Sequence, residues 1–211
     1  MSYRVAVTQR VEDFADRGER RDALDQAWAA WIGSTGDIPV VIPNRLDDVV
    51  AFVRELQLDA LVLTGGNDLT HLPGATNTAA ERDATETALL QHATDEGLPV
   101  LAVCRGMQML VDFWGGSVTR IDGHVATAHE IDRKFSPWPL RTGPVNSFHD
   151  WGIAADAVGA TLEVLATAPD GSVEAVAHRT LPQVGIMWHP ERAEPDLADR
   201  ELLSVLLAAG R

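Results

Sequence analysis

The feature of the sequence that most constrains the fold is the alternation of short apolar runs with longer amphipathic stretches. Four runs rich in Val, Ile, Leu and Ala are expected to form strands, at residues 4–8, 38–43, 60–64 and 99–103. A strand without a polar face must be covered on both sides, which is the situation in parallel sheets built from βαβ units. The alternation therefore predicts an α/β fold.

The stretches between these runs have the periodicity of helices with one buried face. Residues 24–32 place apolar side chains at i, i+3, i+4, i+7 and i+8, counted from Leu24, and this spacing forms one stripe of a helix. Similar patterns predict helices at residues 49–56, 80–96, 107–113 and 197–207.

The second half of the chain changes character. Its strand-like runs are separated by short turns such as PDGS, which favours antiparallel hairpins; the runs are residues 145–148, 161–166, 172–177 and 183–188. No internal repeat, low-complexity tract or linker interrupts the sequence. We therefore expect residues 1–211 to form a single domain.

The charge and the single cysteine argue against several classes of function. Lysine and arginine number 17 against 31 aspartates and glutamates, which gives a net charge of −14. This balance argues against nucleic-acid polymers and anionic membranes as partners, because both attract basic surfaces. No apolar run approaches the roughly 20 residues that span a bilayer, and one cysteine cannot form an intrachain disulfide. We therefore expect a cytoplasmic location.

The cysteine lies at a turn where a nucleophile would be exposed. Cys104 follows the predicted strand at residues 99–103 and precedes a predicted helix, and in open α/β sheets ligands bind at the carboxyl ends of the strands. Backbone N–H groups at the start of a helix favour a thiolate and can bind an oxyanion. Taken alone, however, a single cysteine is more often a small buried core residue.

Two further segments follow predicted strands. His189 and Glu191 are two residues apart, so in extended backbone they share a face, where a carboxylate can orient an imidazole. Gly65 and Gly66 allow a backbone amide to approach a ligand closely. Each segment alone also fits a structural histidine or an ordinary turn. Together, a cysteine, a histidine and a carboxylate form the usual set of nucleophile, base and orienting group.

Together these segments resemble the class I glutamine amidotransferase-like family, in particular its γ-glutamyl hydrolase branch, peptidase C26. The motifs that carry the resemblance are TGGND at 64–68, ERDATETALL at 81–90, AVCRGMQ at 102–108, VNSFH at 145–149 and HPE at 189–191. They follow one another in the family's order and cover nearly the whole chain.

The resemblance implies a flavodoxin-like three-layer sandwich, with a mostly parallel central sheet and a small antiparallel extension in the second half. One position departs from the family pattern, since Ala102 stands where the cysteine turn usually has glycine. Alanine is the smallest change at that position, so it bears on local strain rather than on activity.

The resemblance also implies the chemistry. Cys104 is expected to be the nucleophile that cleaves a γ-glutamyl amide through a thioester, with His189 as base and acid and Glu191 as its orienting group. The oxyanion hole would consist of the backbone N–H groups of Gly66 and Arg105. No metal or organic cofactor is implied.

The glutamyl part of the substrate is expected at two further segments. Gln108 is placed to hold the α-amino or α-carboxylate group, and Ser147, Phe148 and His149 match the family's second glutamyl-binding segment. For His149 an alternative stays open, in which its side chain supports the site from behind by hydrogen bonding.

The segment at residues 8–28 bears on the leaving group. Within the branch it resembles the γ-glutamyl-CDP-amidate hydrolases more than the γ-glutamyl-aminobutyrate hydrolases. It carries Arg10, Arg20 and Arg21, and guanidinium groups suit phosphate oxygens, so we expect some of them to bind a phosphorylated leaving group. The alternative is a solvated loop in which these arginines pair with neighbouring acids.

Three functions remain open. A stand-alone hydrolase of a small-molecule γ-glutamyl substrate is favoured, because the loop reads TGGND rather than the P-G-G-P form of biosynthetic glutaminases. The alternative is a glutaminase subunit that delivers ammonia to a synthetase partner; a silent regulatory member is disfavoured, and homodimerisation is left open.

Residues 121–142 are expected to form a specificity flap. The adjacent His129 and Glu130 within it do not indicate a metal site, because neighbours in a strand point to opposite faces.

Overall fold

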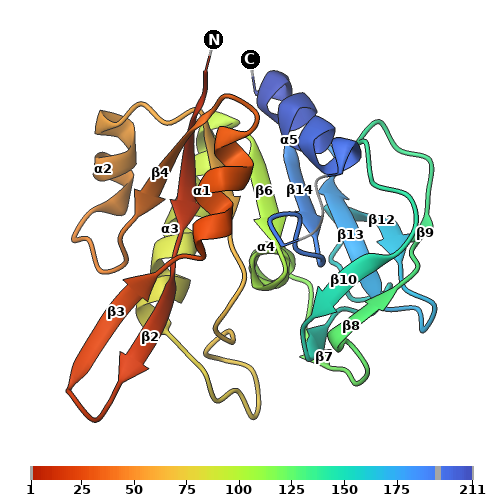
Figure 1. Ribbon diagram of the computed structural model, residues 1–211, viewed down its shortest axis with the longest axis horizontal. Helices are drawn as coiled ribbons and strands as arrows, with labels where there is room; N and C mark the ends of the chain where they lie inside the picture. The colour runs from red at the N-terminus through yellow and green to blue at the C-terminus, as the bar shows by residue number, and fades with distance from the viewer. Residues whose placement is uncertain (1, 193–195, 211) are drawn as a thin grey trace.

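An eight-stranded sheet runs through the computed structural model, which describes residues 2–192 and 196–210. Its strand order is β4-β1-β5-β6-β14-β13-β12-β9 (Figure 1). The first five strands are parallel to one another: β4 (Ile38–Ile42), β1 (Arg4–Thr8), β5 (Ala60–Leu63), β6 (Val100–Val103) and β14 (Gln183–Ile186).

The other three strands form the antiparallel extension that the sequence predicts in the second half. They are β13 (Val173–His178), β12 (Leu162–Thr167) and β9 (Asp132–Arg133). The short turn before β13 makes β12 and β13 a hairpin, which is the connection expected for neighbouring antiparallel strands.

Five helices cover the two faces of the sheet among the described residues: α1 (Gln26–Gly33), α2 (Val49–Glu55), α3 (Ala80–Glu96), α4 (Arg105–Phe113) and α5 (Leu197–Ala209). On one face, α1 and α5 share a hydrophobic cluster that includes Trp28 and Leu203. On the other, α2, α3 and α4 share a cluster that includes Val53, Leu90 and Leu110. The predicted three-layer α/β fold is thereby confirmed.

Local signals in the sequence set where several helices begin and end. Asp25 caps α1 by accepting a hydrogen bond from the Ala27 amide, and Asp48 caps α2 by accepting one from Ala51. Helix α3 ends at Gly97, whose φ of +68° lies in the left-handed region that glycine adopts without steric cost.

The segment that follows β1 forms strands that the sequence did not indicate. Its strands β2 (Arg10–Phe14) and β3 (Glu19–Ala23) form an antiparallel hairpin outside the main sheet, at the lower left of Figure 1. Asp13 and Arg20 are cross-strand partners and form an ion pair of 2.7 Å. Opposite charges that face each other across two strands stabilise their pairing. The many charged residues of this segment are therefore compatible with an antiparallel hairpin as well as with a loop.

Two small sheets lie beside the extension. β8 (Val125–His129) pairs with β10 (Val145–Phe148), and β7 (Thr119–Arg120) pairs with β11 (Trp151–Gly152). The 145–148 strand predicted from the sequence is therefore present, but it lies outside the main sheet. The segment expected to be a flap contains β8 and β9.

The close approach of α4 to β5 depends on Gly106. A Cβ at this position would lie 2.3 Å from the Leu63 carbonyl oxygen, whereas a Cβ at Gly33 would meet nothing within 4 Å. Gly106→Ala is expected to lower the free energy of unfolding by about 3 kcal/mol, because overpacked sites must distort. Gly33→Ala should leave it unchanged or raise it by up to about 1 kcal/mol. Urea denaturation measures both, and equal stabilities of the two variants would contradict the proposed clash.

Candidate active site

The carboxyl ends of three neighbouring parallel strands bring the predicted catalytic segments together. Because β5, β6 and β14 are adjacent in the sheet, the residues that follow them meet at one edge. A Cβ on Gly65 would lie 2.7 Å from the His189 ring and 3.5 Å from the Cys104 Cβ. The first glycine of the loop is therefore the residue that leaves space for the histidine beside the cysteine.

Cys104 occupies a strained backbone conformation between β6 and α4. Its φ of 54° and ψ of −111° are unusual for a residue with a side chain, and such conformations cost about 1–3 kcal/mol. The surrounding structure holds it in place: the Cys104 amide donates to the Ile186 carbonyl at 2.8 Å, and its carbonyl accepts from the Gln108 amide at 3.1 Å. This geometry is the tight turn typical of a nucleophile on a strand-to-helix connection, and Cys104 is 6% exposed there.

The charges of Cys104 and His189 shift each other's pKa. Burial raises the pKa of the Cys104 thiol, but the charge and hydrogen bond of His189, helped by His149, outweigh burial and lower it. Burial also lowers the pKa of His189, but the Cys104 thiolate and the Glu191 carboxylate outweigh this effect and raise the pKa to about 9. The two groups therefore favour a thiolate–imidazolium pair at neutral pH.

His189 is fixed from two sides. Its ring Nδ1 lies 2.7 Å from Glu191 Oε1, so this nitrogen carries the proton and Nε2 is directed to the other side. The Asn146 side chain accepts from the His189 amide at 2.8 Å and donates to the His189 carbonyl at 2.9 Å. Asn146 lies in the motif VNSFH, but its contact with His189 was not predicted. The reason is that Asn146 binds the backbone of a segment that is distant in the sequence.

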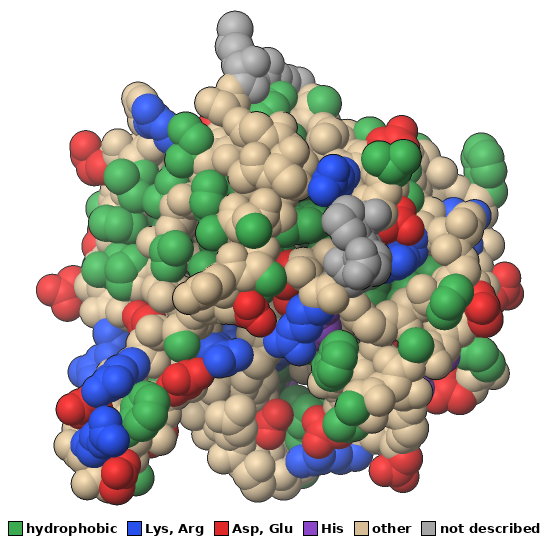
Figure 2. Space-filling model, viewed as in Figure 1, with side chains coloured by type: hydrophobic (Ala, Val, Ile, Leu, Met, Phe, Trp, Pro, Cys, Tyr) green, Lys and Arg blue, Asp and Glu red, His purple; other side chains and the backbone are tan. Residues whose placement is uncertain are grey.

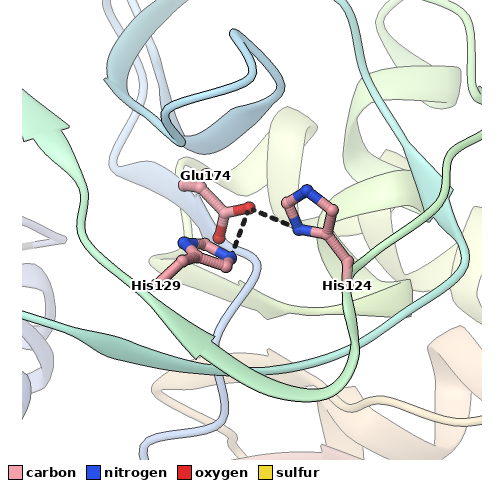
Figure 3. Close-up of side chains that lie close together, drawn as sticks. All are labelled: His124, His129 and Glu174. Carbon is pink, nitrogen blue, oxygen red and sulfur yellow. Dashed lines mark ion pairs between the residues drawn. The ribbon is translucent and has the colours of Figure 1, made fainter.

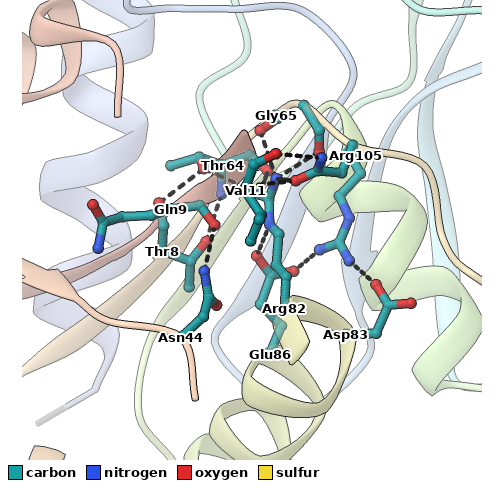
Figure 4. A network of polar contacts seen from close by, with 12 residues as sticks. Thr8, Gln9, Val11, Asn44, Thr64, Gly65, Arg82, Asp83, Glu86 and Arg105 are labelled. Carbon is teal, nitrogen blue, oxygen red and sulfur yellow. Dashed lines mark hydrogen bonds and ion pairs between the residues drawn. The ribbon is translucent and has the colours of Figure 1, made fainter. Parts of the chain in front are cut away.

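A buried arginine holds the glycine loop (Figure 4). The guanidinium group of Arg82 is fully buried and donates to the carbonyl of Gly65 at 3.0 Å and of Gly66 at 2.5 Å. In a trans peptide the N–H points away from the C=O, so binding the Gly65 carbonyl turns the Gly66 N–H away from Arg82. Arg82 was not predicted as a site residue, although it lies in the matched motif at 81–90.

Arg105 has two separate roles in its main chain and its side chain. Its backbone N–H, at the start of α4, interacts with the Cys104 thiol and contributes to lowering the pKa of that thiol. Its buried side chain forms ion pairs with Glu86 and Asp83 on α3. Because Glu86 also binds Arg82 at 2.8 Å, the loop after β5 and the start of α4 are tied to the same helix.

The predicted glutamyl-binding residues are placed differently from one another. Gln108 and His149 meet at one acceptor, since Gln108 Nε2 lies 3.1 Å and His149 Nδ1 3.0 Å from the Trp151 carbonyl oxygen. Phe148 is 43% exposed and its ring lies 5.8 Å from that of His189. The Ser147 hydroxyl is buried and donates to the His124 carbonyl at 2.7 Å, so it does not face the cysteine.

The predicted phosphate-binding arginines separate into two groups. Arg10 lines a cavity together with Gly65, His189, Glu191 and Arg192, of which the last was not predicted from the sequence. The side chain of Arg192 lies over the Phe148 ring, 5.2 Å from its centroid.

Arg20 and Arg21 do not line that cavity. Arg20 pairs with Asp13 and Glu81, each at 2.7 Å, and Arg21 pairs with Glu19. Figure 2 shows blue and red side chains interspersed on the hairpin that projects at the lower left. The pairing with neighbouring acids that the sequence left open is therefore present for both residues, and also for Arg10, which pairs with Glu12 at 2.6 Å.

The described residues contain one group of side chains that could hold a metal ion, namely His124, His129 and Glu174. It lies on and beside the antiparallel strands, apart from the Cys104–His189–Glu191 set. In residues 2–192 and 196–210, none of the helices has the length and apolar character needed to cross a membrane.

Comparison with known proteins agrees with this geometry. The peptidase C26 family model matches residues 5–191. A γ-glutamyl-CDP-amidate hydrolase of Campylobacter jejuni is 28% identical, over 89% of this chain and 90% of its own. A γ-glutamyl-γ-aminobutyrate hydrolase of Escherichia coli is 30% identical, over 83% and 81%.

Solved structures support the fold. A GMP synthase subunit from Thermoplasma acidophilum superposes with a TM-score of 0.73, covering 100% of this chain and 94% of its own at 18% identity. The flavodoxin-like class predicted from the sequence is thereby confirmed. With the family match over residues 5–191, the chain belongs to the peptidase C26 family and is a cysteine-dependent hydrolase of the glutamine amidotransferase-like kind.

Proposed function

We propose that this enzyme hydrolyses a γ-glutamyl amide through a thioester on Cys104, and releases glutamate and an amine or phosphoramidate. The observation that carries the proposal is the placement of Cys104 beside His189, whose Nδ1 lies 2.7 Å from Glu191 Oε1. In this arrangement the pKa of the thiol is lowered and that of His189 is raised to about 9. This pair lies at the sheet edge beside a glycine loop. Such an arrangement supplies a nucleophile and a proton donor at neutral pH.

In the first step, the Cys104 thiolate attacks the γ-carbonyl carbon and the carbonyl π electrons move to its oxygen. We assign the oxyanion hole to the backbone N–H groups of Gly66 and Arg105. A donor of this type is typically worth about 2.7–4 kcal/mol in the transition state. Arg82 and the Arg105 side chain would hold these two backbone segments in position, so that their N–H groups stay directed at the oxyanion.

In the second step, the tetrahedral intermediate collapses as the C–N bond breaks. The His189 imidazolium gives its proton to the leaving nitrogen, and a thioester remains on Cys104. Neutral His189 then takes a proton from water as the oxygen attacks the thioester carbon. The second collapse breaks the C–S bond and releases glutamate, so that the thiolate and the imidazolium are restored.

The glutamyl group is assigned to the Gln108 side chain and to the segment that contains Ser147, Phe148 and His149. For Ser147 and His149 we assign main-chain contacts, because the Ser147 hydroxyl donates to His124 and His149 Nδ1 to Trp151. The side-chain nitrogens of His149 then support the site from behind, as the sequence left open.

For the leaving group we favour a phosphorylated one, like that of a γ-glutamyl-CDP-amidate. The support is the similarity to the C. jejuni hydrolase and the position of Arg10 beside Gly66 and His189. Guanidinium groups bind phosphate oxygens in a bidentate manner. We give Arg10 the main role because it lies beside His189, whereas Arg20 and Arg21 do not. All three arginines pair with carboxylates, Arg10 with Glu12 at 2.6 Å, so a phosphate at Arg10 would replace this contact.

The second candidate is a glutaminase that delivers ammonia to a synthetase partner. Its support is a glutamine-hydrolysing GMP synthase subunit of Methanococcus maripaludis, which is 27% identical over 77% of this chain and 80% of its own. In this case glutamine is the substrate, and turnover would depend on the partner.

The substrate class is tested by glutamate release from glutamine, γ-glutamyl-γ-aminobutyrate and a γ-glutamyl phosphoramidate nucleotide. We expect the nucleotide to give the highest kcat/KM, and Cys104→Ser to reduce every rate by about 10⁴-fold or more, since it removes the thiolate. A highest rate with glutamine would favour the glutaminase. Unchanged rates in Cys104→Ser would contradict the thioester mechanism.

The proton transfers predict a bell-shaped dependence of kcat/KM on pH. The midpoint of the acid limb is expected at a pH below the usual pKa of a thiol, because the pKa of Cys104 is lowered. The alkaline limb falls near pH 9, where His189 loses the proton that the leaving nitrogen needs. In Glu191→Gln this limb should move to lower pH, since Glu191 helps to raise the His189 pKa. Glu163→Gln, on the distant strand β12, serves as the control, and a limb unmoved in Glu191→Gln would contradict the orienting role.

The role of Arg10 is tested by comparing the effect of its substitution on substrates with and without a phosphate. Arg10→Gln should raise KM for the phosphorylated substrate by about tenfold to a hundredfold, the size of a lost charged hydrogen bond, and leave γ-glutamyl-γ-aminobutyrate unaffected. Arg17→Gln, at the turn of the hairpin, is the matched control. A double Arg20→Gln, Arg21→Gln variant tests the wider assignment. If only the double variant loses the phosphorylated substrate, phosphate binding belongs to the hairpin and not to Arg10.

A further inference from the structure

Glu174 on β13 is a buried carboxylate whose charge lacks a partner at hydrogen-bond distance. The residue is 0% exposed, and neither Oε1 nor Oε2 has a hydrogen-bond partner among the described residues. A buried carboxylate in this state is costly, so buried charges are normally paired or coordinate a metal. The surroundings of Glu174 therefore point to a missing positive group.

Three histidines surround this carboxylate. Glu174 Oε1 lies 3.5 Å from His129 Nε2, 3.6 Å from His124 Nδ1 and 3.6 Å from His149 Nε2. The ring of His124 lies 4.8 Å from that of His129 and 4.9 Å from that of His149, centroid to centroid. Figure 3 shows His124 and His129 directed at the same oxygen from two sides.

The outer nitrogen of each ring is held by an oxygen. His124 Nε2 lies 2.8 Å from Asp170 Oδ2, and His149 Nδ1 lies 3.0 Å from the Trp151 carbonyl. The third ring, that of His129, has its Nδ1 3.2 Å from the Glu130 carbonyl.

A nitrogen that faces an oxygen acceptor carries the hydrogen, so the inner nitrogen of the neutral ring presents its lone pair. The Ser147 hydroxyl, 3.5 Å from His124 Nδ1, does not change this assignment, because it donates to the His124 carbonyl at 2.7 Å. In the neutral His124 and His129 rings, two lone pairs and the Glu174 carboxylate thus converge, and a cation relieves their repulsion.

The distances fit an ion better than direct hydrogen bonds. A charged imidazole would approach a carboxylate to about 2.7–2.9 Å, which is shorter than the 3.5 Å and 3.6 Å observed. Ligands at about 2.0–2.1 Å from a tetrahedral ion are separated by about 3.3 Å. The donor atoms of His124, His129 and Glu174 all lie within 4.8 Å of one another.

We propose that His124, His129 and Glu174 bind one divalent transition cation of the Zn²⁺ type, with a fourth position left for water. Imidazole nitrogens and a carboxylate are donors that this ion prefers, and Asp170 behind His124 is the outer-shell carboxylate that commonly accompanies a metal-ligating histidine. The side chain of His129 is 14% exposed and gives the ion a route of entry.

The position of this site defines its role. Its ligands are His124, just before β8, His129 at the end of β8, and Glu174 on β13. Because β8 pairs with β10, the ion would fasten the small β8–β10 sheet to the main sheet. Strand β10 carries Asn146, which holds the His189 backbone. The ion is thus a structural fastener behind the glutamyl-binding segment, and the reaction steps proposed above do not pass through it.

The test uses the full chain with Cys104→Ser, so that the thiol cannot bind metal, after removal of ions with a chelator. Titration with Co²⁺ should give the intense visible absorption of a tetrahedral ion, saturating at about one equivalent per chain. Zn²⁺ should displace this absorption and raise the melting temperature, because a ligand of the folded state stabilises it.

Variants identify the ligands. Glu174→Gln and His124→Asn should weaken Co²⁺ binding by at least about a hundredfold, and Asp170→Asn by about 10–100-fold. His71→Asn and Glu163→Gln, which lie outside the cluster, are matched controls and should bind as the parent does. If Glu174→Gln does not fold, as judged by circular dichroism, His124→Asn and Asp170→Asn still decide.

Two results would contradict the proposed metal site. One is a parent protein that shows no tetrahedral Co²⁺ spectrum, and the other is binding that survives in His124→Asn and Asp170→Asn. Neither result depends on γ-glutamyl hydrolysis, because metal binding is measured without substrate and in a variant without the nucleophile.

Discussion

The geometry of the catalytic edge depends on one buried guanidinium group. Arg82 lies under the glycine loop and binds the carbonyls of Thr64, Gly65 and Gly66. Three carbonyls crowded at the end of a strand would otherwise need water or would turn outward. With Arg82 in place, the loop keeps one conformation, and the peptide that faces the cysteine is fixed before any substrate arrives. Such preorganisation is what makes a hydrogen-bond donor effective in a transition state.

This arrangement requires that the buried charge be balanced. Arg82 and Arg105 share the carboxylate of Glu86, and Asp83 takes the second contact of Arg105. Two cations and two anions are thus placed on and beside one helix. Removing Glu86 would leave the buried Arg82 without a carboxylate partner, which costs more than an ion pair is worth on the surface. The same four side chains join the β5 loop to α4, so the two halves of the proposed oxyanion hole move as one unit.

The sequence predicted the main sheet, its helices and the approach of Cys104, His189 and Glu191 to one another, because their signals are local or motif-like. The segments that form β1, β5 and β6 are short runs of apolar residues, which indicate buried strands. The turn at Cys104 is recognised by the motif AVCRGMQ around it. The hairpin β2–β3 could not be predicted in this way. Its strands RVEDF and ERRDA lack a regular apolar alternation, and their pairing rests on facing charges.

Residues that act through the backbone of a distant segment were also missed. Arg82 and Asn146 are ordinary polar residues until the fold places a loop carbonyl or a histidine amide beside them. The histidines around Glu174 come from separate segments whose approach depends on the small β8–β10 sheet. The adjacent pair of His129 and Glu130 gave no indication of this cluster, because the carboxylate that faces His129 comes from β13.

The hairpin that borders the cavity is held in two ways, and these respond differently to the solvent. The Asn67 side chain binds the amide and the carbonyl of Val11 at 2.8 Å and 3.0 Å, and both contacts are buried. Further out, the ion pairs of the hairpin are exposed, and exposed pairs are weakened by salt. Ionic strength therefore acts on the outer part of the hairpin, whereas its base and the catalytic edge are insulated. In the function proposed above, salt would therefore act on the side of the site that receives the leaving group, and not on the buried Cys104–His189 pair.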